Sequence, residues 1–244
     1  MRVKINCDMG EGFGKYRIAD DASIMPLIDQ ANIACGFHAS DPVIMRDTVA
    51  MAADHGVAIG AHPSLPDLQG FGRREMKIPA SDLFAMICYQ VGALAGMLIP
   101  YGVSLSHLKP HGALYGMACR DADVAQVIAD VAKQFDLPVL GLPNTLQEKT
   151  YVEAGVSFVG EFFADLEYQP NGHLAIVKNP ASINAKSAAT RAINAIKTGT
   201  TPAIDGSLVP VNAQSICVHS DNPGGLDLIK ELRVRLGAIE RVSS

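Results

Sequence analysis

The chain has 244 residues, of which 48% are hydrophobic and 18% charged, a composition typical of a globular protein with one large core. Its net charge of −5, with Lys and Arg dispersed, offers no basic stripe for a nucleic-acid backbone, so we expect no DNA or RNA partner. No long apolar segment precedes a cleavage site, and the apolar stretches are broken by Gly, Gln or Pro. We therefore expect a cytoplasmic protein with no membrane partner.

Short apolar runs alternate with helical patterns along the chain. Strands are predicted near residues 3, 32, 58, 105, 139, 158 and 217. Helical spacing predicts helices over residues 43–55, 81–99, 121–135, 145–154, 182–197 and 226–236. This alternation implies parallel strands joined by right-handed crossovers. The predicted fold is an α/β, single-domain, distorted (β/α) barrel of seven parallel strands over residues 1–244.

Three local features refine this prediction. Asp41-Pro42 should cap and start the first long helix. Gly92 and Gly96 share a face of the longest helical pattern and should let that helix lie close to the barrel. Residues 167–177 have no clear period, so an irregular or hairpin excursion is expected there.

The stretch from His107 to Tyr115 places two imidazoles and an ammonium directly after the alternating run 103–106. Pro110 restricts Lys109 to extended conformations, so the chain should leave the sheet here with its ionisable groups at the edge. Open sites lie at that edge in parallel α/β folds. A single histidine in such a place is more often a core residue, so the prediction depends on whether the pattern recurs.

The pattern does recur, because six apolar runs each end in Asp, Glu, His or Lys beside small residues. The residues at these ends are Asp8, His38, His62, Lys109 with His111, Glu161, and His219 with Asp221. A parallel barrel brings such strand ends to one face, which makes these residues candidates for one site. The loop 63–77, long and rich in Gly, Pro and Arg, should lie over the same face.

Histidines, carboxylates and a lysine without a nucleophilic serine favour hydrolysis by an activated water. Asp8, His38 and His62 are also of the right types to bind a divalent metal with a free coordination position. They follow three different strands, so their spacing decides nothing and both a metal-dependent and a metal-free site stay open. The five cysteines lie far apart and are interpreted as reduced, buried thiols, although a nucleophilic role for Cys7, Cys35 or Cys217 stays open.

Six ordered segments of the chain resemble the LamB/YcsF family. They are residues 6–14, 31–39, 60–63, 70–74, 109–115 and 161–165, and the resemblance covers nearly the whole chain. It implies a barrel similar to the glycoside hydrolase/deacetylase superfamily. It also implies an ATP-dependent 5-oxoprolinase activity that opens 5-oxoproline to L-glutamate, with ATP and the 5-oxoprolinase subunits B and C contributing through a complex.

The resemblance and the strand ends together give two sets of candidate residues. The catalytic candidates are Asp8, Glu11, Lys109, His111, Glu161, Asp165 and His219. The substrate-binding candidates are His38, Arg73, Arg74, Tyr115 and Asp221. Whether the chain forms a homo-oligomer stays open.

The chain departs from the family pattern at Leu166, near Lys178 and at Ser220, where Arg, Arg and Gly are usual. A carboxylate clamp made by those arginines would be altered, because Lys does not replace Arg at a bidentate site. The exact substrate therefore stays open. Two rival functions also remain: a metal-dependent deacetylase or amide hydrolase, and a non-catalytic protein that holds the lactam for its partners.

Overall fold

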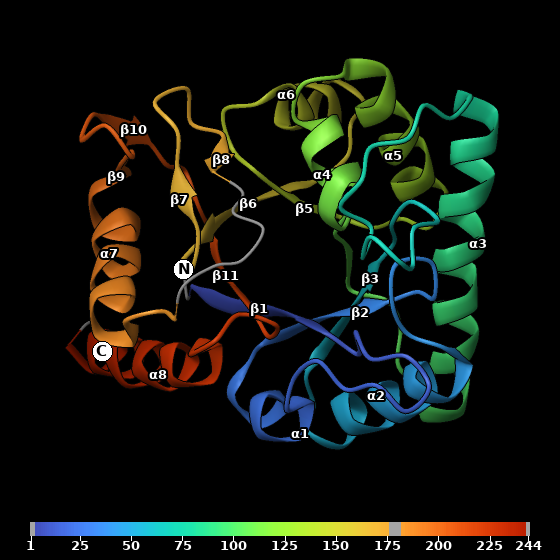
Figure 1. Cartoon of the computed structure of the whole chain (residues 1–244), viewed down its shortest axis with the longest axis horizontal. Coiled ribbons are helices and arrows are strands. Elements are labelled where there is room, and N and C mark those ends of the chain that lie inside the picture. Colours follow the sequence, from blue (N-terminus) through green and yellow to red (C-terminus); the bar gives the residue numbers. More distant parts are fainter. Residues whose placement is uncertain (1–2, 176–181, 243–244) are drawn as a thin grey trace.

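The computed structural model describes residues 3–175 and 182–242, so Lys178 lies outside the described residues. Its centre is a closed barrel of seven parallel strands in the order β1-β11-β6-β5-β4-β3-β2 (Figure 1). The strands are β1 (Lys4–Met9), β2 (Gln30–Ala34), β3 (Ala58–His62), β4 (His107–Leu108), β5 (Val139–Gly141), β6 (Phe158–Phe163) and β11 (Ser215–His219). The predicted seven-stranded parallel barrel is confirmed.

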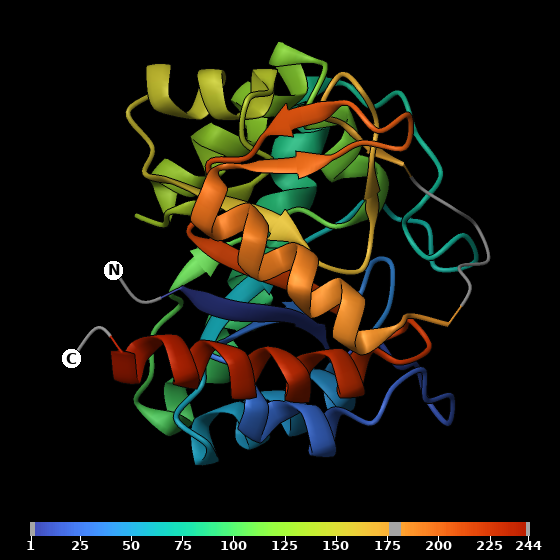
Figure 2. The same ribbon diagram turned by 90° about the vertical axis from the view of Figure 1, so that its left-hand side faces the viewer.

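Helices surround the barrel (Figures 1 and 2). They are α1 (Asp21–Ile24), α2 (Pro42–Asp54), α3 (Ala80–Leu98), α4 (Gly112–Ala118), α5 (Ala122–Gln134), α6 (Leu146–Glu153), α7 (Ala185–Thr198) and α8 (Gly225–Val242), with 3-10 turns η1 (Met25–Leu27) and η2 (Ile99–Tyr101). The predicted cap is present, because the Asp41 carboxylate accepts hydrogen bonds from the backbone N–H groups of Val43 and Ile44 at 2.8 and 3.0 Å.

Two antiparallel hairpins lie outside the barrel. The first pairs β7 (Glu167–Tyr168) with β8 (Leu174–Ala175), within the segment where an excursion was predicted. The second pairs β9 (Thr200–Pro202) with β10 (Leu208–Pro210) and follows α7. The β7–β8 hairpin lines the cavity described below, so the first excursion helps to build the site.

The fourth strand begins later than predicted. Val103 is exposed, and the ladder to β3 starts only at His107, which pairs with Gly60. The His107 ring lies within the barrel and fills the space beside Gly60, where an added Cβ would sit 2.1 Å from its Nε2. Asn32 Oδ1 is 2.7 Å from that nitrogen, and burial lowers the pKa of His107 to about 3. His107 is thus a neutral core residue.

The expectation for Gly92 and Gly96 is wrong. Both lie on the exposed face of α3, and a Cβ at either position would meet open space. Leu83, Ile87 and Val91 form part of the opposite, buried face, because large side chains bury more apolar surface than a glycine groove can. Residues 80–101 are long and apolar enough to cross a membrane by length and composition alone, a test that core helices and signal sequences also pass.

Candidate active site

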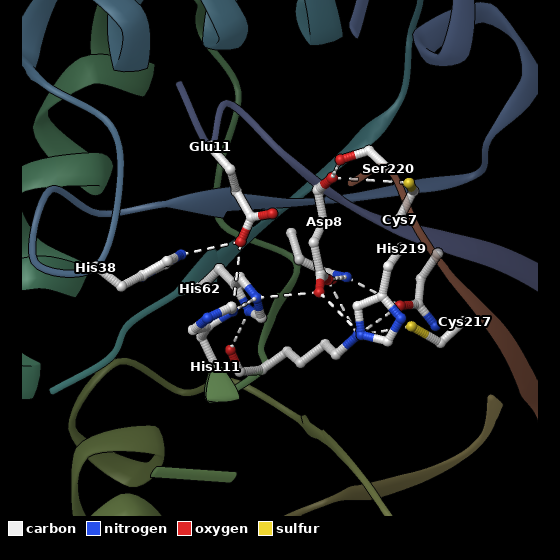
Figure 3. A network of polar contacts seen from close by, with 12 residues as sticks. Cys7, Asp8, Glu11, His38, His62, His111, Cys217, His219 and Ser220 are labelled. Atoms are coloured by element: carbon white, nitrogen blue, oxygen red, sulfur yellow. Dashed lines mark hydrogen bonds and ion pairs between the residues drawn. The ribbon is translucent and has the colours of Figure 1, made fainter. Parts of the chain in front are cut away.

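A cavity of about 1320 Å³ opens at the carboxyl ends of the barrel strands. Eight of the predicted site residues line it: Asp8, His62, Arg73, Lys109, His111, Tyr115, Asp165 and His219. Three of them lie in β1, β3 and β11, four lie in the loops after β3, β4 and β6, and Tyr115 lies in α4, since side chains at and after parallel strand ends meet on one face. Figure 3 shows Asp8 between a group of histidines and the pair His219 and Cys217.

Lys109 forms the centre of the buried charge network. Its ammonium Nζ lies 3.0 Å from Asp8 Oδ1, 3.3 Å from Glu161 Oε2 and 3.0 Å from Cys217 Sγ. Burial alone would lower the pKa of Lys109, but the negative groups around it outweigh burial and raise the pKa well above its usual value. Lys109 is therefore a permanent cation at the floor of the cavity.

Asp8 is held as a carboxylate. Its Oδ1 accepts hydrogen bonds from Asn32 Nδ2 at 2.7 Å and from Lys109 Nζ, while its Oδ2 lies 3.3 Å from His62 Nε2. Burial raises the pKa of Asp8, yet His62 in its protonated form and the Lys109 ammonium outweigh burial and hold the pKa well below the usual range. The negative charge of Asp8 thus persists within a nearly solvent-free site, where charges act strongly.

His219 and Asp165 form a second ionic pair on the cavity wall. The Asp165 Oδ2 atom accepts from the backbone N–H of His219 at 2.8 Å and lies 3.0 Å from His219 Nδ1, and Asn222 donates to the same oxygen. Burial lowers the pKa of His219, but Asp165 outweighs it and raises the pKa to about 9. His219 is therefore an imidazolium at neutral pH, with its Nε2 3.7 Å from Asp8 Oδ2.

This pair predicts a pH-dependent contribution to stability. The folded-state pKa of His219, about 9, exceeds its ordinary value of 6.5, so the stabilisation is fully present below pH 6.5 and is lost as the pH rises through 9. The shift corresponds to at most about 3 kcal/mol. The free energy of unfolding in urea is measured for the wild type and for His219→Gln at pH 6, 7.5 and 9.5. The wild type should be the more stable protein at pH 6, and most of this difference should be lost at pH 9.5. A difference that stays constant across this range would contradict the ion pair.

Three histidines and a glutamate form a third cluster next to Asp8 (Figure 3). The His62 and His111 rings meet edge to face, with His111 Nδ1 3.0 Å from His62 Nε2. The His38 ring stacks on His111 at 3.8 Å, and His38 Nε2 lies 3.0 Å from Glu11 Oε1. Burial lowers the pKa of His38 and His111 and raises that of Glu11, so burial opposes charge on all three groups.

Other predicted residues lie away from the cavity surface. Glu11, His38 and Glu161 are buried behind it. The structure does not gather the predicted metal trio in one group, because Asp8 contacts Lys109 whereas His38 contacts Glu11. The strands place these two side chains in neighbouring but separate clusters.

The two arginines of the loop 63–77 lie in different surroundings. Arg73 lines the cavity and pairs with Asp221 at 2.8 Å, so Asp221 orients Arg73 at the mouth and does not itself line the cavity. Arg74 points away and pairs with Asp67 while remaining 62% exposed. In this structure the Arg74 guanidinium ties together two parts of its own loop, and its predicted role in substrate binding stays a prediction.

Several polar residues of the site were not predicted. Asn6 donates to Glu161 Oε2 at 3.2 Å, and Asn32 donates to Asn6 and Asp8, so amides link the carboxylates inside the barrel. The sequence pattern could have identified Asn6, because side chains two residues apart on a strand share a face and Asn6 lies two residues before Asp8. Arg191, on α7, also lines the cavity, and no strand-end pattern marks it.

The cysteines near the site are buried thiols. Burial raises the pKa of Cys7 and Cys217 well above the usual value and that of Cys35 to about 12. A nucleophilic cysteine needs a depressed pKa and access to substrate, and the three thiols are buried. Their interpretation as packing residues is the one that the geometry favours.

Comparison with known proteins decides the family. Residues 3–242 match the LamB/YcsF family. The chain belongs to the LamB/YcsF family.

Family members resemble the chain over nearly its full length. The lactam utilization protein lamB of Emericella nidulans is 46% identical over 234 residues, which cover 94% of this chain and 92% of that protein. The 5-oxoprolinase A subunit of Thermus thermophilus is 42% identical over 240 residues, 97% of this chain and 96% of that protein. The crystal structure of a lactam utilization protein from Thermus thermophilus has a TM-score of 0.91 at 40% identity, covering 98% of each chain.

Two of the three residues that depart from the family pattern, Leu166 and Ser220, take part in hydrogen bonds beside the site. The Ser220 hydroxyl donates to the Asp8 backbone carbonyl at 2.8 Å and so supports the loop behind the site. The Leu166 carbonyl accepts from Arg191 at 2.7 Å, and both residues line the cavity. Arg191 and Arg73 therefore keep positive charge at this cavity although position 166 is apolar.

Proposed function

We propose that this chain is the A subunit of an ATP-dependent 5-oxoprolinase and supplies the acid–base groups that open the lactam ring. The observation that carries the proposal is the charge network of Asp8, Lys109 and His219 on the cavity of a chain closely related to 5-oxoprolinase subunits. Arg73 and Arg191 line the same cavity and would attract the carboxylate of 5-oxoproline.

Ring opening by water needs a base for the water, a cation for the developing oxyanion and a proton for the leaving nitrogen. Asp8 is the carboxylate that takes the proton of the attacking water. Lys109 stabilises the oxyanion from the cavity floor. His219, charged at neutral pH, gives its proton to the ring nitrogen as the C–N bond breaks, and Asp165 orients its ring.

A lactam amide is unreactive, so we assign to ATP the activation of its carbonyl oxygen and assign ATP binding to the complex with subunits B and C. Water then attacks the activated carbon, the ring C–N bond breaks, and glutamate is released together with ADP and inorganic phosphate from the cleaved ATP. The proposed location is the cytoplasm, which suits five free cysteines.

Glutamate release from 5-oxoproline by the purified subunits tests the proposal. We expect ATP-dependent release only when this chain is combined with both partner subunits. Omission of each component in turn is the control, and a lactam without the carboxylate, such as 2-pyrrolidinone, tests the role of the arginines. Full turnover without this chain, or by this chain alone, would contradict the assignment.

A further inference from the structure

His62 and His111 each use one ring nitrogen to bond a backbone carbonyl, which leaves their other ring nitrogens facing each other. His62 Nδ1 lies 2.7 Å from the Lys109 carbonyl oxygen, and His111 Nε2 lies 2.8 Å from the Phe71 carbonyl oxygen. A carbonyl oxygen only accepts hydrogen bonds, so each of these ring nitrogens carries the proton. His62 Nε2 and His111 Nδ1, only 3.0 Å apart, can therefore each direct a lone pair at the space between them, where a proton or a metal cation would bind.

Carboxylate oxygens adjoin both lone pairs. Glu11 Oε1 lies 3.3 Å from His111 Nδ1, and Asp8 Oδ2 lies 3.3 Å from His62 Nε2. When Glu11 is ionised, four buried acceptors thus converge where a proton or a metal cation is required. His38, whose Nε2 lies 3.0 Å from Glu11 Oε1, can donate to the carboxylate from its far side.

We propose that Glu11, His62 and His111 bind one divalent transition-metal ion of the zinc class. Ligands about 2.0–2.1 Å from a tetrahedral ion lie about 3.3–3.4 Å apart, close to the 3.0 and 3.3 Å between these donor atoms. Both histidines already donate their other N–H to a backbone carbonyl, the arrangement typical of metal-ligating imidazoles. Two imidazoles and a carboxylate suit zinc and leave a coordination position for a ligand from the cavity.

The neighbouring donors of Asp8, Cys217 and His219 do not form a competing metal site. Their cation position is taken by the Lys109 ammonium, 3.0 Å from both Asp8 Oδ1 and Cys217 Sγ. A metal there would meet an ammonium that the carboxylates keep charged. The metal site therefore lies on the histidine side of Asp8. This inference does not depend on the proposed reaction.

Metal analysis of the full chain tests the site. After treatment with a chelator and dialysis, the protein is loaded with Zn²⁺ or with Co²⁺, its content is measured by mass spectrometry of the metal, and its affinity by calorimetry. We expect about one equivalent of either ion. The Co²⁺ absorption spectrum should show d–d bands of nitrogen and oxygen ligands without the charge-transfer band of a thiolate.

Variants locate the ion. His62→Ala and His111→Ala should each weaken Zn²⁺ binding by at least about a hundredfold, while Glu11→Gln should weaken it through loss of a ligand charge. His55→Ala is the matched control, because His55 is exposed at the end of α2 and should bind metal like the wild type. Cys217→Ser should also retain the ion. Circular dichroism of each variant shows whether it is folded.

Three outcomes would overturn the inference. One is a folded wild-type chain that retains no metal at micromolar free Zn²⁺, which would mean that a proton joins the facing nitrogens. Another is a thiolate band in the wild-type Co²⁺ spectrum, which needs no variant and would place the ion beside Cys217. The last is equal loss of binding in His55→Ala and His62→Ala.

Discussion

Asp8→Asn should reduce glutamate release by the three-subunit enzyme at least about a hundredfold, the usual contribution of a positioned acid or base. The substitution keeps the size of the side chain and its contact with Asn32, but it removes the charge that takes the proton of water. The steady-state rate at saturating ATP and 5-oxoproline measures the effect, and co-purification with the partner subunits shows whether assembly persists.

Asp205→Asn is the control for this experiment, because Asp205 is an exposed turn residue whose carboxylate binds only the local Ser207 among the contacts described for it. Its turnover should equal that of the wild type. Near-normal turnover in Asp8→Asn would leave Asp8 as a turn residue before the glycine loop. Asp165 would then be the candidate base, and unchanged turnover in its variants too would favour a protein that only holds the lactam.

Lys109→Met should both destabilise the fold and abolish turnover. Methionine fills a similar space, but the carboxylates of Asp8 and Glu161 would then lie buried without their shared cation. Leaving a buried charge unpaired costs about 3–5 kcal/mol. For a chain of this length we expect a fall in Tm on the order of 10 °C by calorimetry.

Lys149→Met is the matched control, since Lys149 and Glu153 form an exposed i,i+4 pair with both side chains 67% exposed. Such pairs contribute less than about 1 kcal/mol, so its Tm should stay within a few degrees of the wild type. If Lys109→Met also melted like the wild type and retained turnover, the buried network would carry neither stability nor catalysis.

The sequence predicted which strand ends would carry the site, because each candidate follows an apolar run and parallel strands share one edge. Asp8, Lys109 and His219 meet as this logic requires. It could not predict their partners, since these depend on barrel closure and strand register. Asp8 faces His219 only because β1 pairs with β11 in the register Asp8↔His219.

The positions of side chains on the strands and helices also explain where the predictions and the structure differ. His38 and Asp8 are of the right types for one metal site, but their side chains leave different strand ends and reach different partners. Gly92 and Gly96 share one face of a helix. When one face carries small residues, helical periodicity alone does not show whether that face is the buried one. β4 starts late because a strand can begin only where the chain lies beside a neighbouring strand, whatever the β propensity of its residues. Val103 is exposed and comes before that point.

Closure of the barrel by its first and last strands has a consequence for synthesis on the ribosome. Lys4 and Ser215, which pair across that seam, are 211 residues apart, so β1 keeps an open edge until β11 has been synthesised. Long-range pairing of this kind slows folding and exposes aggregation-prone surface in the meantime. The same strand carries His219, so closure of the barrel and arrival of His219 beside Asp8 are one event in folding.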